Sequence, residues 1–106
     1  SIVNNASIAG SIGMPGAGVY IASKHAVLGL TRSAALEVER DGIRVNAVSP
    51  AAIETPMLDR FTGNRNPDMM GYMTSLHPSA VLFLFSSASA FMTGHDLKVD
   101  GGFTVP

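Results

Sequence analysis

The chain has 106 residues, of which 46% are hydrophobic and 14% are charged, and its formal net charge is −1. This composition excludes a disordered chain, which would need low hydrophobicity and high net charge, and it predicts neither a nucleic-acid partner nor a membrane span, because the charge is close to zero and no apolar run reaches about 18 residues. Cys is absent, which excludes disulfides and thiolate chemistry and favours a reducing, cytoplasmic location.

The first half of the chain predicts a strand, a loop and a long helix. Residues 1–4 form an apolar strand end, and residues 5–18 have the glycine and proline content of a loop. Residues 19–40 contain no proline and repeat small and apolar side chains at helical spacing. Gly42 stands where the glycine just beyond a helix end belongs, so the helix is expected to stop there.

The second half predicts two further strands around a second helix. Residues 43–49 have strand character and end at Pro50. Residues 50–78 contain several Pro, Gly and Met residues, which indicates an irregular segment, with room for short helices, of the kind that forms a mobile lid. Residues 79–91 return to helical spacing, and residues 96–100 indicate a short last strand.

This order of elements predicts an α/β fold. Two β-α-β units imply a parallel sheet with right-handed crossovers. Because both faces of a parallel sheet must be covered, three strands and two main helices indicate part of a larger doubly wound, Rossmann-like sheet. We therefore interpret residues 1–106 as the C-terminal portion of one such domain, without its amino-terminal dinucleotide-binding half.

Tyr20 and Lys24 are the first candidates for chemistry. They are spaced i, i+4 near the start of the predicted helix and so share one face of it. A cation about 4 Å from a phenol is worth about 4 kcal/mol at an effective dielectric of 20, enough to lower the pKa of a tyrosine by up to roughly three units. Ser7 follows the first strand, at the edge where ligands of open α/β sheets bind, and its hydroxyl can donate to a carbonyl oxygen. On spacing alone, a packed ring with a lysine extended past it is the commoner explanation.

Five motifs then occur in a characteristic order: S-I-V-N-N-A-S-I-A-G, Y-I-A-S-K, I-R-V-N-A-V-S-P, I-E-T-P and T-G-H-D-L-K-V-D-G-G. With them the chain resembles, over essentially its whole length, the C-terminal half of a classical short-chain dehydrogenase/reductase. The resemblance implies that Ser7 holds the substrate oxygen and that Tyr20 is the general acid/base and also contacts the cofactor. It implies further that Lys24 binds the nicotinamide ribose and lowers the Tyr20 pKa. It also implies NAD or NADP as the cofactor and a small alcohol or ketone as the substrate.

The segment after the second strand is the further part that the resemblance assigns to the cofactor. It implies contacts from Pro50, from the backbone N–H of Ile53 and from the hydroxyl of Thr55. Ala51 stands where the family usually has glycine, and its Cβ limits how closely the backbone and the cofactor approach. A simple turn at the entrance of a loop is the alternative interpretation. The three histidines show no metal-ligand spacing, so we predict no metal site.

Two features depart from the family pattern. The glycine-rich T-G-x-x-x-G-x-G turn that cradles the pyrophosphate is absent from the 106 residues. The His-Pro pair at 77–78 runs directly into the second helix without the usual charged turn, as a natural deletion or a join across an absent loop would produce. Two hypotheses therefore stand: an NAD(P)-dependent oxidoreductase of an alcohol or carbonyl, and a catalytically incompetent fragment that acts as a packing or interaction module.

Assembly is the last expectation. A small domain with few charged residues exposes apolar patches, which another subunit or another part of the polypeptide would cover. The small residues of helix 19–40 and the apolar residues of helix 79–91 favour contacts between helices, and the family resemblance implies a homodimer or homotetramer. Burial within the chain is the alternative for the second helix.

Overall fold

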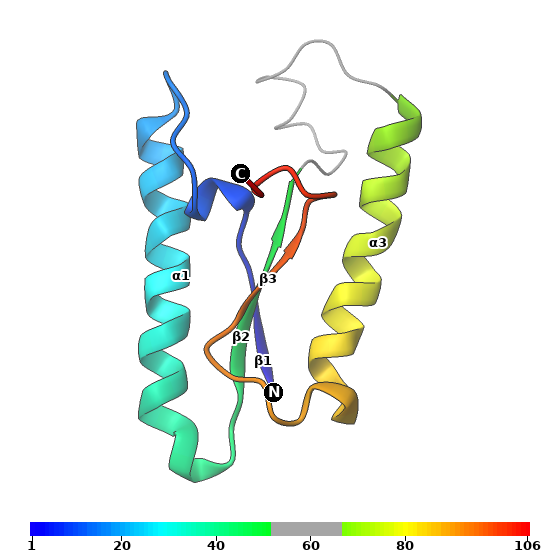
Figure 1. The fold of residues 1–106 in the computed structure, drawn as a ribbon. Helices are drawn as coiled ribbons and strands as arrows, with labels where there is room; N and C mark the ends of the chain where they lie inside the picture. Colours follow the sequence, from blue (N-terminus) through cyan, green and yellow to red (C-terminus); the bar gives the residue numbers. More distant parts are fainter. Residues whose placement is uncertain (52–66) are drawn as a thin grey trace.

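A parallel sheet lies between two long helices in the computed structural model of the protein (Figure 1). The structure describes the backbone of residues 1–51 and 67–106 and the side chains of residues 1–51 and 75–106. In chain order the main elements are β1 (Ile2–Asn5), α1 (Gly18–Val38), β2 (Val45–Pro50), α3 (Pro67–Phe85) and β3 (Asp96–Val99), and the short 3₁₀ turns are η1 (Ile8–Gly10), η2 (Glu39–Asp41) and η3 (Ser87–Ser89). The predicted α/β class is confirmed.

The three strands are parallel in the order β1-β2-β3, so their carboxyl ends share one edge of the sheet. Side chains alternate between the two faces of a strand. Asn4 accordingly faces α1 and donates from Nδ2 to the Thr31 hydroxyl at 3.0 Å, whereas Oδ1 of Asn5 lies 3.1 Å from Nε2 of His77 on α3. The two helices therefore cover opposite faces of the sheet, as Figure 1 shows.

The core is built around the central strand, all six residues of which are buried. Ala47 of β2 packs with Ala6 and Leu28, so that α1 approaches the sheet through small side chains. The one amide in this strand is fully buried and is satisfied, because Asn46 donates to the Met92 carbonyl at 2.9 Å and accepts from the His95 N–H at 3.0 Å. In the described part of the chain, no helix is long and apolar enough to cross a membrane.

The helix boundaries agree with the sequence at α1 and differ at α3. After η2, Gly42 adopts a left-handed φ of 70°, so the predicted helix-ending glycine is confirmed. The helix expected over 79–91 instead runs from Pro67 to Phe85. Residues 67–78, expected to be irregular or to hold short helices, belong to this one long helix. A proline lacks an N–H and favours a helix boundary, but Pro78 lies inside α3, and the helix continues from it into Ser79.

The end of α3 is set by a side chain from another element. Arg44, just before β2, donates from Nη2 to the Leu84 carbonyl at 3.0 Å and from Nη1 to the Ser89 carbonyl at 2.9 Å and the Met92 carbonyl at 3.3 Å. The last carbonyl groups of a helix have no partner within it. The Arg44 guanidinium therefore satisfies carbonyl groups at the ends of α3 and η3 and links both elements to the start of the central strand.

Candidate active site

Ser7 lies at the carboxyl end of β1, where it caps η1. Its Oγ accepts from the Ala9 N–H at 3.1 Å, and the residue is only 7% exposed. A hydroxyl has one proton to donate as well as two lone pairs, and within the described residues this O–H has no acceptor. Ser7 thus presents a buried, oriented donor at the sheet edge where ligands of open α/β folds bind.

Tyr20 and Lys24 lie together on the side of α1 that faces the sheet. Both are half-buried and follow the same helical stripe as the buried Leu28 and Thr31. The Lys24 Nζ lies 5.7 Å from the centroid of the Tyr20 ring, within the range of a cation–π contact. The predicted shared face is confirmed, and a positive charge stands directly beside the phenol.

Gly10 connects the Ser7 turn to this helix. A Cβ built on Gly10 would lie 2.9 Å from the backbone oxygen of Lys24 and 2.7 Å from Cδ1 of Leu28. The last residue of η1 therefore rests on the turn of α1 that carries Lys24, and the elements that hold the three candidate residues are in direct contact. The sequence analysis did not single out Gly10; the signal that would have found it is the S-x-x-G spacing from Ser7.

Gly10→Ala is expected to lower the kcat of the full-length gene product about tenfold, because an added Cβ must push η1 away from α1, and a misplacement of about 1 Å can cost up to a hundredfold. Steady-state assays measure this. Gly13→Ala is the matched control, since a Cβ there meets nothing within 4 Å. An unchanged kcat in Gly10→Ala would show that this contact does not position the site.

The structure places only the start of the predicted cofactor segment. Pro50 is buried at the carboxyl end of β2, in register with Val99 of β3. The next residue, Ala51, donates its N–H to the Val99 carbonyl at 3.2 Å, so the chain leaves the sheet beside β3. Ile53 and Thr55 lie outside the described residues, and their predicted contacts stay predictions.

The described donors suit one end of a nicotinamide cofactor. Tyr20 and Lys24 place a hydroxyl and an ammonium at the carboxyl edge, and such groups suit the hydroxyls of a ribose. The T-G-x-x-x-G-x-G turn that cradles a pyrophosphate between a strand and a helix does not occur in the described residues. Nor do three or more His, Cys, Asp or Glu residues in the described part of the chain come close enough to hold a metal ion.

Comparisons with known proteins connect this geometry to a family. Residues 1–104 match the family model described as enoyl-(acyl carrier protein) reductase. A 2,5-dichloro-2,5-cyclohexadiene-1,4-diol dehydrogenase of Sphingobium indicum is 46% identical over 98% of this chain and 46% of its own length. A cyclohexanol dehydrogenase of an Acinetobacter species is 41% identical over 98% of this chain and 43% of its own length. The chain spans about half the length of the curated relatives it matches.

Solved structures agree with the fold. A 4-hydroxyisoleucine dehydrogenase mutant in complex with NADH and succinate superposes with a TM-score of 0.84 at 32% identity, covering 99% of this chain and 47% of that one. Acetoin dehydrogenase from Enterobacter cloacae gives a TM-score of 0.80 at 40% identity, covering 98% of this chain and 43% of that one.

The alignment with the Sphingobium relative extends over 115 positions, more than the 106 residues present, so that relative has positions without a counterpart here.

Proposed function

Because the chain belongs to the short-chain dehydrogenase/reductase family, we propose that it carries the catalytic residues of an NAD(P)-dependent oxidoreductase that interconverts a secondary alcohol and its ketone. One observation carries the proposal. The Lys24 ammonium stands 5.7 Å from the Tyr20 ring centroid on the sheet-facing side of α1, and the turn capped by Ser7 rests on that same helical turn. A donor, a proton carrier and a cation therefore meet at one edge of the sheet.

Each residue has a separate role in this reaction. The Ser7 O–H donates to the substrate oxygen and holds it in place. In oxidation, the Tyr20 phenolate oxygen takes the alcohol proton; in reduction, the Tyr20 hydroxyl returns it to the carbonyl oxygen. Lys24 stabilises the phenolate by its charge and binds the ribose hydroxyls. The nicotinamide, when bound, supplies the hydride chemistry.

The names of the relatives support a class of substrate and a class of cofactor for this protein. Two of the relatives are named for alcohols on six-membered carbon rings, and we propose a neutral secondary alcohol on a ring for this protein. Related structures have been solved with NADH and, at 34% identity and a TM-score of 0.80, with NADP. Either dinucleotide is therefore proposed as the cofactor, together with Pro50, Ile53 and Thr55 as further contacts to it.

NADH titration followed by fluorescence tests the proposal. The full-length gene product is expected to enhance NADH or NADPH fluorescence and to oxidise cyclohexanol. The 106 residues by themselves are expected to bind poorly and to turn over nothing, because they lack the glycine-rich phosphate cradle. Absence of both binding and turnover in the full-length product would favour the interaction module instead. Turnover by a chain of verified 11.0 kDa mass would show that cofactor binding does not need the glycine-rich phosphate cradle.

We also propose that the enzyme assembles as a homodimer or homotetramer through α1. The outward side of this helix exposes small and apolar residues, namely Val19, Ala22, Ala26, Gly29 and Leu30. Such side chains let a second helix approach closely while burying apolar surface. Light scattering of the full-length gene product is expected to give two or four times the chain mass, and a monomer would contradict this assembly. The cytoplasmic location expected from the sequence stays a prediction.

A further inference from the structure

A buried carboxylate holds the turn that follows β3. Asp100 accepts hydrogen bonds from the Gly102 N–H at 2.9 Å, from the Thr104 N–H at 3.0 Å and from the Thr104 hydroxyl at 2.6 Å. Gly101 and Gly102 have φ values of 61° and 86°, a left-handed conformation that favours glycine. Local hydrogen bonds and backbone conformation thus fix this turn in one shape.

The carboxylate is charged under ordinary conditions. The Thr104 hydroxyl lowers the Asp100 pKa below its usual value, with help from the two backbone N–H groups and against the effect of burial. Its contribution to stability is therefore fully present above the unfolded pKa of about 4 and is lost as the pH falls through the lower folded pKa. Near neutral pH the Asp100 carboxylate therefore keeps its hydrogen bonds to Gly102 and Thr104.

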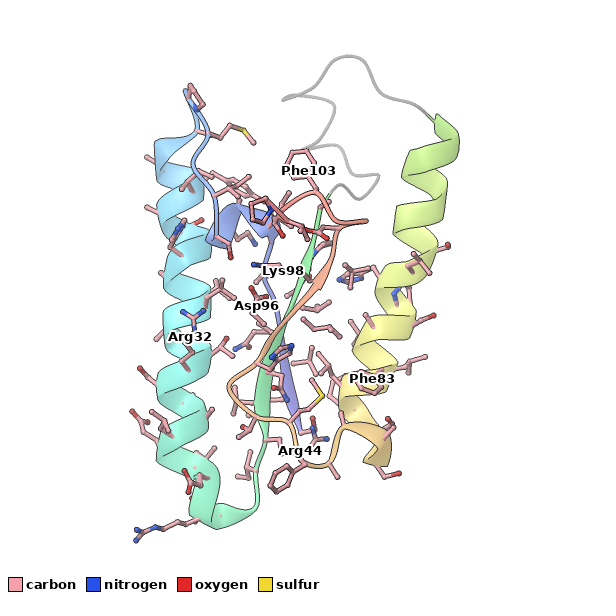
Figure 2. The ribbon with its side chains drawn as sticks, viewed as in Figure 1. Arg32, Arg44, Phe83, Asp96, Lys98 and Phe103 are labelled. Atoms are coloured by element: carbon pink, nitrogen blue, oxygen red, sulfur yellow. The ribbon has the colours of Figure 1, made fainter. Side chains whose placement is uncertain are left out.

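This ordered turn presents an aromatic ring to solvent. Phe103 is 69% exposed although its backbone N–H is fixed to the Asp100 carbonyl at 3.1 Å. Burying a Phe side chain is worth about 1.5–3 kcal/mol. An apolar ligand that covers this exposed ring would therefore gain binding free energy. Figure 2 shows Phe103 beyond the ends of the strands, between α1 and α3.

Phe103 follows β3 at the same edge of the sheet at which Ser7 follows β1. Val99, the last residue of β3, is in register with Pro50 of β2, and β1 is the next strand along. Strands are about 4.8 Å apart, which puts the carboxyl ends of β1 and β3 about 10 Å from each other. A six-membered ring bound by its oxygen at the β1 end extends part of the way across that gap, toward β3.

We propose that Phe103 is a specificity-determining residue, whose ring forms an apolar wall of the substrate site and selects alcohols that carry a carbon ring. Asp100 is its positioning residue, since it acts only through the turn. This inference rests on the proposed function and deepens it. The occupant is the apolar half of the substrate, because Phe103 lies on the edge where the proton-transfer residues meet.

The test compares a ring alcohol with a small one in the full-length gene product. Phe103→Ala is expected to raise the KM for cyclohexanol about tenfold and to change the KM for 2-propanol less than about twofold, with kcat for both nearly unchanged. Phe103→Leu is expected to restore most of the affinity for cyclohexanol. Val105→Ala is the matched control, because Val105 is 71% exposed on the same segment and is expected to alter neither KM.

The outcomes separate this inference from the proposed function. Suppose that the unmodified protein binds NADH and oxidises both alcohols, but Phe103→Ala changes the two KM values equally or not at all. Phe103 then does not form a wall of the substrate site, and the proposed oxidoreductase function is unaffected. If the unmodified protein neither binds NADH nor oxidises either alcohol, the proposed function fails, and this inference fails with it. Asp100→Asn, measured in parallel, is expected to reproduce the selective rise in KM at unchanged NADH affinity; equal KM changes for both alcohols would overturn its positioning role.

Discussion

Tyr20→Phe is expected to lower the kcat of the full-length gene product about a thousandfold, within the range that general acid–base catalysis contributes, while NADH affinity changes less than about twofold. The substitution removes the oxygen that carries the proton and keeps the ring over which the Lys24 ammonium lies. The Lys24 ammonium therefore stays in place to bind the ribose, and most of the loss falls on proton transfer. Steady-state kinetics give kcat, and NADH fluorescence gives the affinity.

Two further variants make this result specific. Ser23→Ala is the control: Ser23 lies on the same helix, is exposed and only donates to the Tyr20 carbonyl at 2.7 Å, so kcat should stay within about twofold. Lys24→Ala should instead lower kcat and cofactor affinity together, because Lys24 is assigned to both the phenolate and the ribose. Near-normal turnover in Tyr20→Phe would show that the acid/base role belongs to another group.

Arg44→Met is expected to cause the largest loss of stability, lowering the free energy of unfolding by about 3 kcal/mol, since hydrogen bonds to a charged group contribute about 1.5–3 kcal/mol each and several are lost together. Methionine keeps the length of the aliphatic stem but removes the guanidinium donor from the Leu84, Ser89 and Met92 carbonyls. The Leu84 carbonyl then keeps the Ser89 hydroxyl as a donor, and the Met92 carbonyl keeps the Asn46 amide. Urea denaturation of the full-length gene product measures the change. Hydrogen exchange should show the amides of η3 and of residues 90–92 opening first.

Arg32→Met provides the control for this experiment. Arg32 is an exposed arginine on α1 with no hydrogen-bond partner among the described residues. Figure 2 shows Arg32 on α1, whereas the Leu84 carbonyl that accepts from Arg44 belongs to α3. Exposed substitutions of this kind usually change stability by less than about 0.5 kcal/mol. An Arg44→Met protein as stable as Arg32→Met would show that water replaces the guanidinium at the end of α3.

The two long helices show which helix boundaries a local sequence pattern can predict. At α1 the repeat of small and apolar residues and the glycine at position 42 predicted the element and its end, and the structure agrees within two residues. At α3 the same reasoning failed, because the glycine and proline content of residues 50–78 favours an irregular segment, although residues 67–78 lie within the helix. Its end at Phe85 is held in part by Arg44, which lies 40 residues from Leu84 in the sequence. No local pattern contains that contact.

The amino-acid sequence alone determined the parallel α/β class and the common helix face of Tyr20 and Lys24, because the order of elements and the i, i+4 spacing follow from backbone geometry within a few residues. Only the tertiary structure decided that this face turns toward the sheet, that Gly10 seats the Ser7 turn on Lys24, and that Asp100 holds Phe103 at the open edge. Those relations join residues that periodicity does not link, and they depend on which surfaces pack together once the strands have paired.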